Sequence, residues 1–424
     1  MKKFFVLFLA AVIFSTLFVS CQRRGPRGAD GQQIRVLLAN HPYGDLLRPL
    51  IPEFERETGI SVLVEQLQEN ILYQNLITEF ATGVSTVDVF MTRPLQEALL
   101  FTRNSWYAPL HDFDFSDFPA PTVDVGRMNG IPHLVPLVTE TQVLYYRRDL
   151  FEAAGLSVPT TFEELENAAR ALTRDDIAGI GVRGAGNPGI TQFATFLYNF
   201  GGRYLVNGRA VIDSPQAIEA LRFYGRLLGN YGPAGITAMS WDQLMPVFQA
   251  GRIAMWADAS VFFDQLVDPA NTVIPRENVG VARMPRGPAA DNPIFAVAWG
   301  MAMANSTRDR ESSMSFLNWA TSSDMALRAM LLNIPMARIS VWYDPQVQAA
   351  MHPGLIEAML HAGQVGYPFD RPFMTSVGQA RDIIGQLIVE TINTSGNSPQ
   401  LEAMATRIAA EVNDLLRHDG DYGR

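Results

Sequence analysis

The sequence predicts an α/β fold in which parallel strands alternate with helices. Near the N-terminus, three short apolar segments of strand type cover 34–40, 60–67 and 87–92, and two amphipathic segments of helix type cover 45–58 and 70–82. Strand–helix–strand order favours a parallel sheet with right-handed crossovers. The chain has 424 residues, 48% of them hydrophobic. That length is sufficient for two or three domains, each with its own core.

Glycines mark the ends of both helix candidates. Gly59 and Gly83 directly follow the last apolar-periodic residues, where a left-handed cap is easiest for glycine. Ligands of parallel sheets lie beyond the carboxyl ends of the strands. The polar residues expected at this rim are Asn40, His41 and Tyr43 after the first strand, and Thr92 and Arg93 after the third. The first strand-to-helix turn carries no glycine fingerprint, which argues against a dinucleotide.

Charge excludes one class of partner. The formal net charge is -10, and the only lysines are Lys2 and Lys3, so every later basic residue is an arginine. Phosphate backbones require a basic face, and this acidic chain is therefore not expected to bind nucleic acid. A neutral ligand is not excluded by this argument.

The N-terminal segment predicts export. Lys2 and Lys3 precede an apolar run over 4–19, which is shorter than a membrane-spanning helix and is typical of a secretory signal. Cys21 is the only cysteine and follows this run in a manner that resembles a bacterial lipobox. We expect a signal peptide over 1–20, a lipidated Cys21, and a polar tether over 21–33 that anchors the protein to the membrane. The alternative is an ordinary signal peptide with a chance cysteine.

The segment 136–156 is expected to be a strand that passes directly into a helix. It begins with β-favouring residues, includes Glu140, continues into a helix at Arg148 and ends at Gly155. A buried glutamate without a partner is costly, so Glu140 is expected to meet a ligand or an arginine. Residues 105–135, rich in Asp, Phe and Pro, are expected to form a long surface segment.

Later segments continue the strand and helix alternation. The clearest helix start lies in 158–172, where a threonine cap precedes acidic residues. A strand with a glycine-rich turn is expected at 179–186, and further helices at 190–200 and 214–228. The methionines between Met325 and Met336 have helical spacing and are expected in the core.

Five stretches of the sequence share a recognisable pattern: YGPAGITAMSWDQLMPVFQAGRIAMWADAS (231–260), ENVGVARMPRGP (277–288), WGMAMANSTRDRESSMSFLNWATS (299–322), LVTETQVLYYRRDLFEAAGLSVPTTFEEL (137–165) and FERETGISV (54–62). Together they resemble a known family, the extracellular solute-binding proteins of ABC importers, in the large sugar-binding group. The polyol-binding subgroup, for sorbitol and mannitol, is the nearest in pattern. The resemblance covers essentially all of the mature chain.

The resemblance implies a two-lobed periplasmic-binding-protein fold, each lobe a mostly parallel sheet flanked by helices, that closes on a ligand by hinge motion. Three crossings are expected near 138–142, 295–299 and 338–343. Lobe one would hold 34–139 and 299–340, and lobe two would hold 142–296 and 344–424. The implied protein is a monomer without a cofactor that captures a sugar or polyol and delivers it to a permease.

The implied site combines flat apolar surfaces with groups that match hydroxyls. The candidate stacking surfaces are Trp241, Trp256 and Trp299. The candidate polar partners are Asn40, His41, Tyr43, Arg93, Glu140, Thr141, Arg183, Asp258 and Arg338. Strand alternation places Trp256 and Asp258 on one face, and Trp299, at a position where the family often has glycine, would narrow the pocket.

Each candidate has a structural alternative. The tryptophans could pack in the core, and the arginines could pair with acids. Two other functions also remain open, a secreted carbohydrate-active enzyme and a sensor for a membrane receptor. No serine elbow, HExxH motif or phosphate loop occurs in the sequence, and the six histidines lack metal-ligand spacing, so neither catalysis nor a metal is expected.

Overall fold

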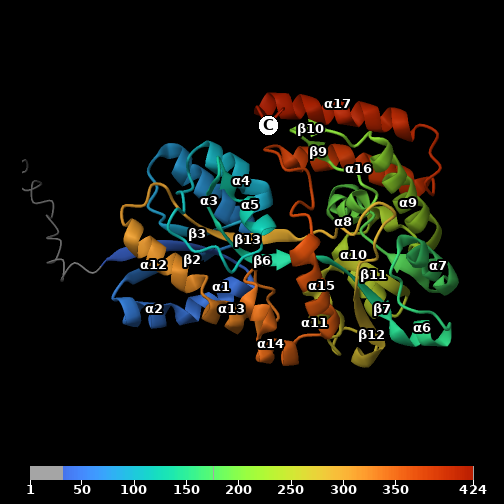
Figure 1. Ribbon diagram of the computed structural model, residues 1–424, viewed down its shortest axis with the longest axis horizontal. Coiled ribbons are helices and arrows are strands. Elements are labelled where there is room, and N and C mark those ends of the chain that lie inside the picture. Colours follow the sequence, from blue (N-terminus) through green and yellow to red (C-terminus); the bar gives the residue numbers. More distant parts are fainter. Residues whose placement is uncertain (1–31, 175, 424) are drawn as a thin grey trace, which may run out of the picture.

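Two lobes, each with its own β-sheet and hydrophobic core, lie side by side (Figure 1). The computed structural model describes residues 32–174 and 176–423. The expected signal peptide, Cys21 and most of the expected tether lie outside the described residues. The α/β class predicted from sequence is therefore confirmed for the described part of the chain.

Lobe one is assembled from two separate stretches of the chain. Its strands are β1 (Gln33–Ala39), β2 (Ser61–Leu67), β3 (Val89–Thr92), β6 (Val135–Glu140), β13 (Ala296–Met303) and the small hairpin β4 (Arg127–Met128) and β5 (Ile131–Pro132). Its helices are α1 (Pro42–Leu47), α2 (Ile51–Thr58), α3 (Glu69–Thr82), α4 (Pro94–Arg103), α5 (Ala120–Asp124), α12 (Arg310–Ala320) and α13 (Ser323–Met330). The sheet order is β2-β1-β3-β13-β6.

Lobe two contains the middle and the end of the chain. Its strands are β7 (Gln142–Arg147), β8 (Ala178–Gly181), β11 (Ile253–Ala259), β12 (Val279–Arg283) and the hairpin β9 (Leu205–Val206) and β10 (Arg209–Ala210). Its helices are α6 (Arg148–Ala153), α7 (Phe162–Leu172), α8 (Gly186–Asn199), α9 (Pro215–Tyr231), α10 (Trp241–Gln249), α11 (Phe263–Leu266), α16 (Val377–Asn393) and α17 (Leu401–Asp419). The main sheet has the order β12-β7-β11-β8.

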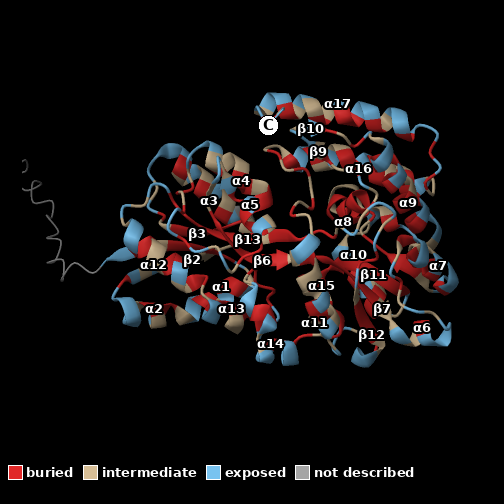
Figure 2. Ribbon diagram, in the orientation of Figure 1, coloured by how far each residue is buried: buried red, intermediate tan, exposed pale blue. Residues whose placement is uncertain are grey.

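Both main sheets are mixed, which differs from the mostly parallel sheets expected. In lobe one, β1 pairs in parallel with β2 and β3, but β13 runs antiparallel to β3 and β6. In lobe two only β8 and β11 are parallel, and β7 runs antiparallel to β11 and β12. The reason is that β7 and β13 enter their sheets from the other lobe, so they do not arrive through a right-handed helical crossover. Figure 2 shows both sheets as buried layers covered by helices with exposed outer faces.

Most helix ends follow the sequence signals. Gly59 and Gly83 cap α2 and α3 with φ of 75° and 68°, in the left-handed region that favours glycine. Thr161 and Glu164 form a complete capping box at the start of α7. The single helix expected over 45–58 is instead two helices, α1 and α2, separated by a short 3-10 turn that contains a proline.

The segment 105–135 is not a surface segment, contrary to expectation. Tyr107, Leu110, Phe113 and Phe118 are at most 6% exposed and belong to the core of lobe one. The aromatic residues that looked like a Phe- and Pro-rich loop in the sequence bury their rings against the sheet, because apolar burial outweighs the irregular backbone.

One residue, Thr141, separates the two sheets at the first crossing. Glu140 ends β6 in lobe one and Gln142 begins β7 in lobe two. Thr141 donates from its hydroxyl to the carbonyl of Ile294 at 2.6 Å, and its backbone N–H donates to the Ser260 hydroxyl at 3.2 Å. The crossing is therefore bonded to lobe two and to the segment that leads back into β13.

The chain stays on lobe one beyond residue 340. The helix α14 (Pro345–Ala350) packs on lobe one, since Val347 and Met351 belong to its core, which differs from the lobe-two boundary expected at residue 344. The helix α15 (Pro353–Val365) contributes Leu355 to the core of lobe two and Met359 to that of lobe one. The remaining lobe boundaries stay a prediction.

The lobes are also joined at a distance from these crossings. Arg103, at the end of α4 in lobe one, forms an ion pair with Asp421, which follows α17 in lobe two, and donates to the carbonyl of Asp419 at 2.5 Å. Asp421 is 5% exposed and also accepts the Thr375 N–H at 2.8 Å. The pair is thus partly removed from solvent screening.

Replacing Arg103 with alanine should weaken the contact between the lobes. We expect a loss of about 1 kcal/mol in the free energy of unfolding, because a partly buried, charge-assisted hydrogen bond is removed. Urea denaturation measures it. The control is Arg127→Ala, which removes an exposed pair with Asp124 and should change stability little. Equal effects of the two substitutions would contradict the assignment.

Candidate functional site

Glu140 lies at the junction of the lobes and has a carboxylate that is free to bind a ligand. Its side chain is half-buried at the end of β6. Among the described residues, none forms a hydrogen bond or an ion pair with its carboxylate. Burial raises the pKa of Glu140 to about 7, while Arg183 and Arg371 act in the opposite direction. A carboxyl group that titrates near neutrality and lacks a protein partner is suited to accept or donate hydrogen bonds to a polar ligand.

Arg183 is held in place by a buried aspartate. Asp258 on β11 is fully buried and accepts the Arg183 Nε–H at 3.0 and 3.1 Å and the Nη2–H at 2.5 Å. Gln192 donates to the same carboxylate at 3.0 Å. Asp258 is therefore saturated, whereas the Arg183 Nη1 has only a long contact of 3.5 Å with Thr191. The arrangement leaves Arg183, rather than Asp258, to meet a ligand.

Three aromatic rings form a stack that ends at the surface. Trp256 is fully buried, its ring lies 5.7 Å from Phe262 at an interplanar angle of 16°, and Phe262 lies 5.0 Å from Trp241 at 21°. Trp241 is 36% exposed at the start of α10. The buried rings fix the orientation of the exposed indole, which can present a flat face to the C–H groups of a ligand.

The lobe-one rim carries a neutral histidine. The His41 Nδ1 accepts the Tyr43 N–H at 3.1 Å, so the proton of the neutral ring is on Nε2. Burial lowers the pKa of His41 to about 4, against the influence of Asp45. The Trp299 ring lies 5.5 Å from the His41 ring, and the neighbouring Asn40 is exposed.

Four other residues predicted to bind the ligand instead form hydrogen bonds or ion pairs within the protein. Tyr43 is fully buried and donates to the carbonyl of Ala320, and Thr141 is bonded within the crossing. Arg93 pairs with Glu69 and Glu97, both at 3.0 Å. Arg338 pairs with Asp117 at 3.0 Å and covers the Phe118 ring at 4.7 Å.

Burial removes two further candidates from direct contact. Alternation along the strand suggested an open face with Trp256 and Asp258, yet every residue of β11 is buried. The reason is that β11 is an inner strand, paired on both edges and covered on both faces. Trp256 orients Trp241 through the ring of Phe262, and Asp258 holds the guanidinium of Arg183.

Sequence reasoning missed two groups at this junction. Phe262, the middle ring of the stack, follows the carboxyl end of β11, which is the signal that could have identified it. Asp370 comes from the segment between α15 and α16, which had no motif in the sequence. It pairs at 2.5 Å with Arg371, an arginine that the sequence led us to expect in a structural pair with an acid, and both charges act on Glu140.

Two other kinds of site were sought among the described residues. No group of three His, Cys, Asp or Glu side chains is arranged to hold a metal ion. None of the described helices has both the length and the apolar character required to cross a bilayer.

Comparison with known proteins identifies the family. The family model described as bacterial extracellular solute-binding protein matches residues 39–326, which is more than half of the chain. The chain belongs to this family. Its members bind solutes and are not enzymes, so the family assignment and the absence of an enzymatic role expected from the sequence are confirmed.

Individual relatives support the same fold. The chain is 29% identical over 300 residues to a mannitol-binding protein of Pseudomonas aeruginosa, covering 67% of this chain and 68% of the relative. It is 26% identical over 338 residues to an erythritol/L-threitol-binding protein of Mycolicibacterium smegmatis, covering 72% and 69%. A solute-binding protein of an ABC transporter from Agrobacterium radiobacter K84, solved with ribitol, is similar with a TM-score of 0.73 at 25% identity, covering 91% of this chain and 99% of that one.

The titration of Glu140 should appear in the pH dependence of stability. The pKa is about 7 in the folded state and near 4.5 in the unfolded chain, so the folded state holds this proton more tightly between these values. The free energy of unfolding therefore falls as the pH rises from about 4.5 to about 7 and loses nothing further above that. The contribution is about 1–3 kcal/mol.

Glu140→Gln should remove this contribution. The difference in unfolding free energy between the wild type and the variant is expected to change by about 1–3 kcal/mol between pH 5 and pH 8, in favour of the variant at high pH. Denaturant titrations at both pH values measure it, with the exposed Glu152→Gln as control. A pH-independent difference would show that Glu140 titrates normally.

Proposed function

We propose that the protein is the substrate-binding component of an ABC importer and that it captures a polyol or a small sugar between its lobes. The observation that carries the proposal is the rigid, exposed Trp241 on lobe two together with the uncommitted Glu140 at the crossing. The polyol-binding relatives support the ligand class.

The chemistry of a polyol matches these groups. Each hydroxyl is both donor and acceptor, and the carbon chain has an apolar C–H surface. Trp241 offers a face to that surface, Glu140 and Asn40 can accept hydroxyl hydrogens, and Arg183 and the Nε2–H of His41 can donate. Trp299 is 6% exposed and belongs to the core of lobe one, with its ring 5.5 Å from the His41 ring, so it supports His41 and does not offer the stacking face expected from the sequence.

The two lobes supply different parts of this set. Asn40 and His41 belong to lobe one, Arg183 and Trp241 to lobe two, and Glu140 lies between them. A ligand that contacts both lobes stabilises the arrangement in which they are close. In this proposal ligand capture is a hinge closure, and the closed form is the one recognised by the permease.

The proposal includes attachment to the membrane through Cys21. The support is the apolar run that precedes this single cysteine. A lipid on Cys21 would keep the receptor on the outer side of the membrane, beside its permease, with the segment up to residue 33 as tether.

Ligand binding can be tested with protein that lacks residues 1–21. Mannitol, ribitol, sorbitol and erythritol are added at increasing concentration while thermal unfolding is followed. A ligand at a hundredfold excess over its Kd should stabilise the folded state by about 2.7 kcal/mol. Trp241→Ala should weaken binding about tenfold, because the stacking face is lost. Glu140→Gln should weaken it about tenfold or more, because a charge-assisted hydrogen bond is lost.

Two controls separate ligand contacts from general effects. Trp241→Phe keeps an aromatic face and should retain most of the affinity, and Glu152→Gln removes an exposed carboxylate elsewhere in lobe two and should change nothing. Stabilisation by an amino acid but by no polyol or sugar would overturn the ligand class. Undiminished polyol binding by both site variants would overturn the site.

Lipidation can be tested separately in a bacterial host. Cells that express the full chain are labelled with radioactive palmitate, and membranes are separated from soluble protein. The wild type should be labelled and sediment with membranes, whereas Cys21→Ser should be unlabelled and released. Labelling that persists in Cys21→Ser would contradict the attachment site.

A further inference from the structure

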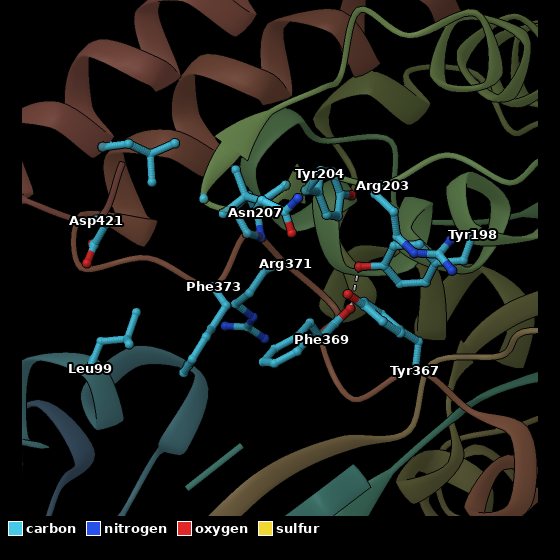
Figure 3. Close-up of a pocket in the computed structure, with 14 residues that line it drawn as sticks. Leu99, Tyr198, Arg203, Tyr204, Asn207, Tyr367, Phe369, Arg371, Phe373 and Asp421 are labelled. Atoms are coloured by element: carbon cyan, nitrogen blue, oxygen red, sulfur yellow. Dashed lines mark hydrogen bonds between the residues drawn. The ribbon is translucent and has the colours of Figure 1, made fainter. Parts of the chain in front are cut away.

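One face of α4 in lobe one meets the C-terminal part of lobe two. Leu95, Leu99 and Arg103 lie at positions i, i+4 and i+8 of this helix, so their side chains follow one stripe along it. Opposite the stripe lie the segment 366–376, which joins α15 to α16, and the residues that follow α17. Figure 3 shows Leu99 on α4 and, facing it, Asp421 at the end of the chain.

The end of the stripe nearest the chain crossings is apolar. Leu95 belongs to a small core of its own, together with Val125 and the first two residues of β13, which pairs with β6 at the crossing. Phe369 and Phe373 of the segment 366–376 pack against this core, and their rings lie 4.8 Å apart. Among the described residues this core is far smaller than the core of either lobe, so it joins the lobes without merging them.

The other end of the stripe is ionic. Arg103 pairs with Asp421 and donates to the carbonyl of Asp419 at 2.5 Å. Eight residues of α4 separate Arg103 from Leu95, which is about 12 Å along the helix axis. A rotation of the lobes about the crossings therefore displaces the ionic end more than the apolar end.

The acidic side of this ion pair is fixed on lobe two. The carboxylate of Asp421 also accepts the Thr375 N–H at 2.8 Å, and that of Asp419 accepts the Ser376 N–H at 2.9 Å. The end of α17 and the residues before α16 are thus bonded into one unit, and Arg103 reaches this unit from lobe one.

The apolar and ionic contacts are separated by open space. A cavity of about 350 Å³ lies between them, with Leu99 on its wall. The lobes are therefore not packed continuously on this side, and a small, interrupted interface can open without disturbing either core. The side chain of Arg103 is 30% exposed, so water can replace its partner when the contact opens.

We propose that Arg103, Asp421 and the segment 366–376 form a releasable latch that holds the two lobes in their present arrangement. In the latched state both contacts are made, and in the released state the ion pair is broken and α4 moves away from the end of the chain. The ratio of the two states is then set by the latch as well as by any ligand. The inference does not rest on the proposed solute, because it concerns the chain without ligand.

The test measures the separation across the latch with no ligand added. Protein without residues 1–21 contains no cysteine, so Ala81→Cys and Ala410→Cys supply the only thiols for spin labels. Both alanines are exposed and lie on α3 and α17, two helices on the side of the molecule that carries the latch (Figure 1). Double electron–electron resonance gives the distribution of distances between the labels. The labelled parent should show a main population at the distance of the present structure and a minor, longer one.

Breaking the ion pair should enrich the longer distance. Arg103→Ala should raise the ratio of the longer to the shorter population about fivefold, because a partly buried ion pair is lost. Asp421→Asn keeps an acceptor for the Thr375 N–H but loses the charge, and its effect should be of similar size. The two substitutions together should add little, since each removes the same pair. Salt at about 1 M should shift the parent in the same direction and leave the double variant unchanged, because it screens the pair.

The matched control is Arg127→Ala, which removes an ion pair within lobe one and should leave the distances unchanged. The proposal is overturned if neither Arg103→Ala nor Asp421→Asn changes the distribution, or if Arg127→Ala shifts it as much as they do. It is also overturned if the effects of the two latch variants add in full, since the residues would then act separately. None of these results depends on whether a polyol binds.

Discussion

Thr141 is the only residue between the last position of β6 and the first position of β7. The sheets of the two lobes are therefore connected here through one residue. Its hydroxyl and backbone N–H are bonded to Ile294 and Ser260, so the strand that leaves lobe one is joined to the segment that returns to it. This constraint places Glu140 at the junction, where its carboxylate is neither fully buried in one core nor fully exposed to solvent. The intermediate burial of Glu140 and its shifted pKa follow from the shortness of the crossing.

The groups proposed to meet the solute depend on residues that cannot touch it. Asp258 is saturated by Arg183, Gln192 and its neighbouring backbone, and this removes the freedom of the Arg183 guanidinium. Trp256 and Phe262 hold the Trp241 ring in the same manner through stacking. Binding a flexible, hydroxylated molecule costs conformational entropy, and a protein surface that is already ordered adds little to that cost. The buried pair and the buried ring thus act on affinity through preorganisation.

Local features of the fold could be predicted from the sequence because they depend on neighbouring residues. The glycine caps at Gly59 and Gly83 and the box at Thr161 are determined within one helical turn, and all three are present. The direction of β7 and β13 could not be predicted in this way, since it depends on which lobe the chain comes from. The order strand–helix–strand correctly indicated only the three strands nearest the N-terminus.

The site was only partly predictable for a related reason. Period-two alternation placed Trp256 and Asp258 on a common face, but whether that face is open depends on helices distant in sequence, and here they cover it. Glu140 was identifiable because a charge within an apolar strand is costly whatever its surroundings. Phe262 is marked only by its place after the carboxyl end of β11, and Asp370 is not marked at all, so only the assembled fold brings them to the junction.

The aromatic stack has an optical consequence. Of its two indoles, Trp256 is sealed in an apolar interior and Trp241 is partly in water, so the first should emit at shorter wavelength than the second. A molecule that binds to the exposed face of Trp241 displaces water from it. The emission maximum of Trp241 should then shift to shorter wavelength, towards that of Trp256. In the proposed site, Trp241 would therefore report whether a solute is bound, because the stacking that orders its ring also places it where the solute is proposed to bind.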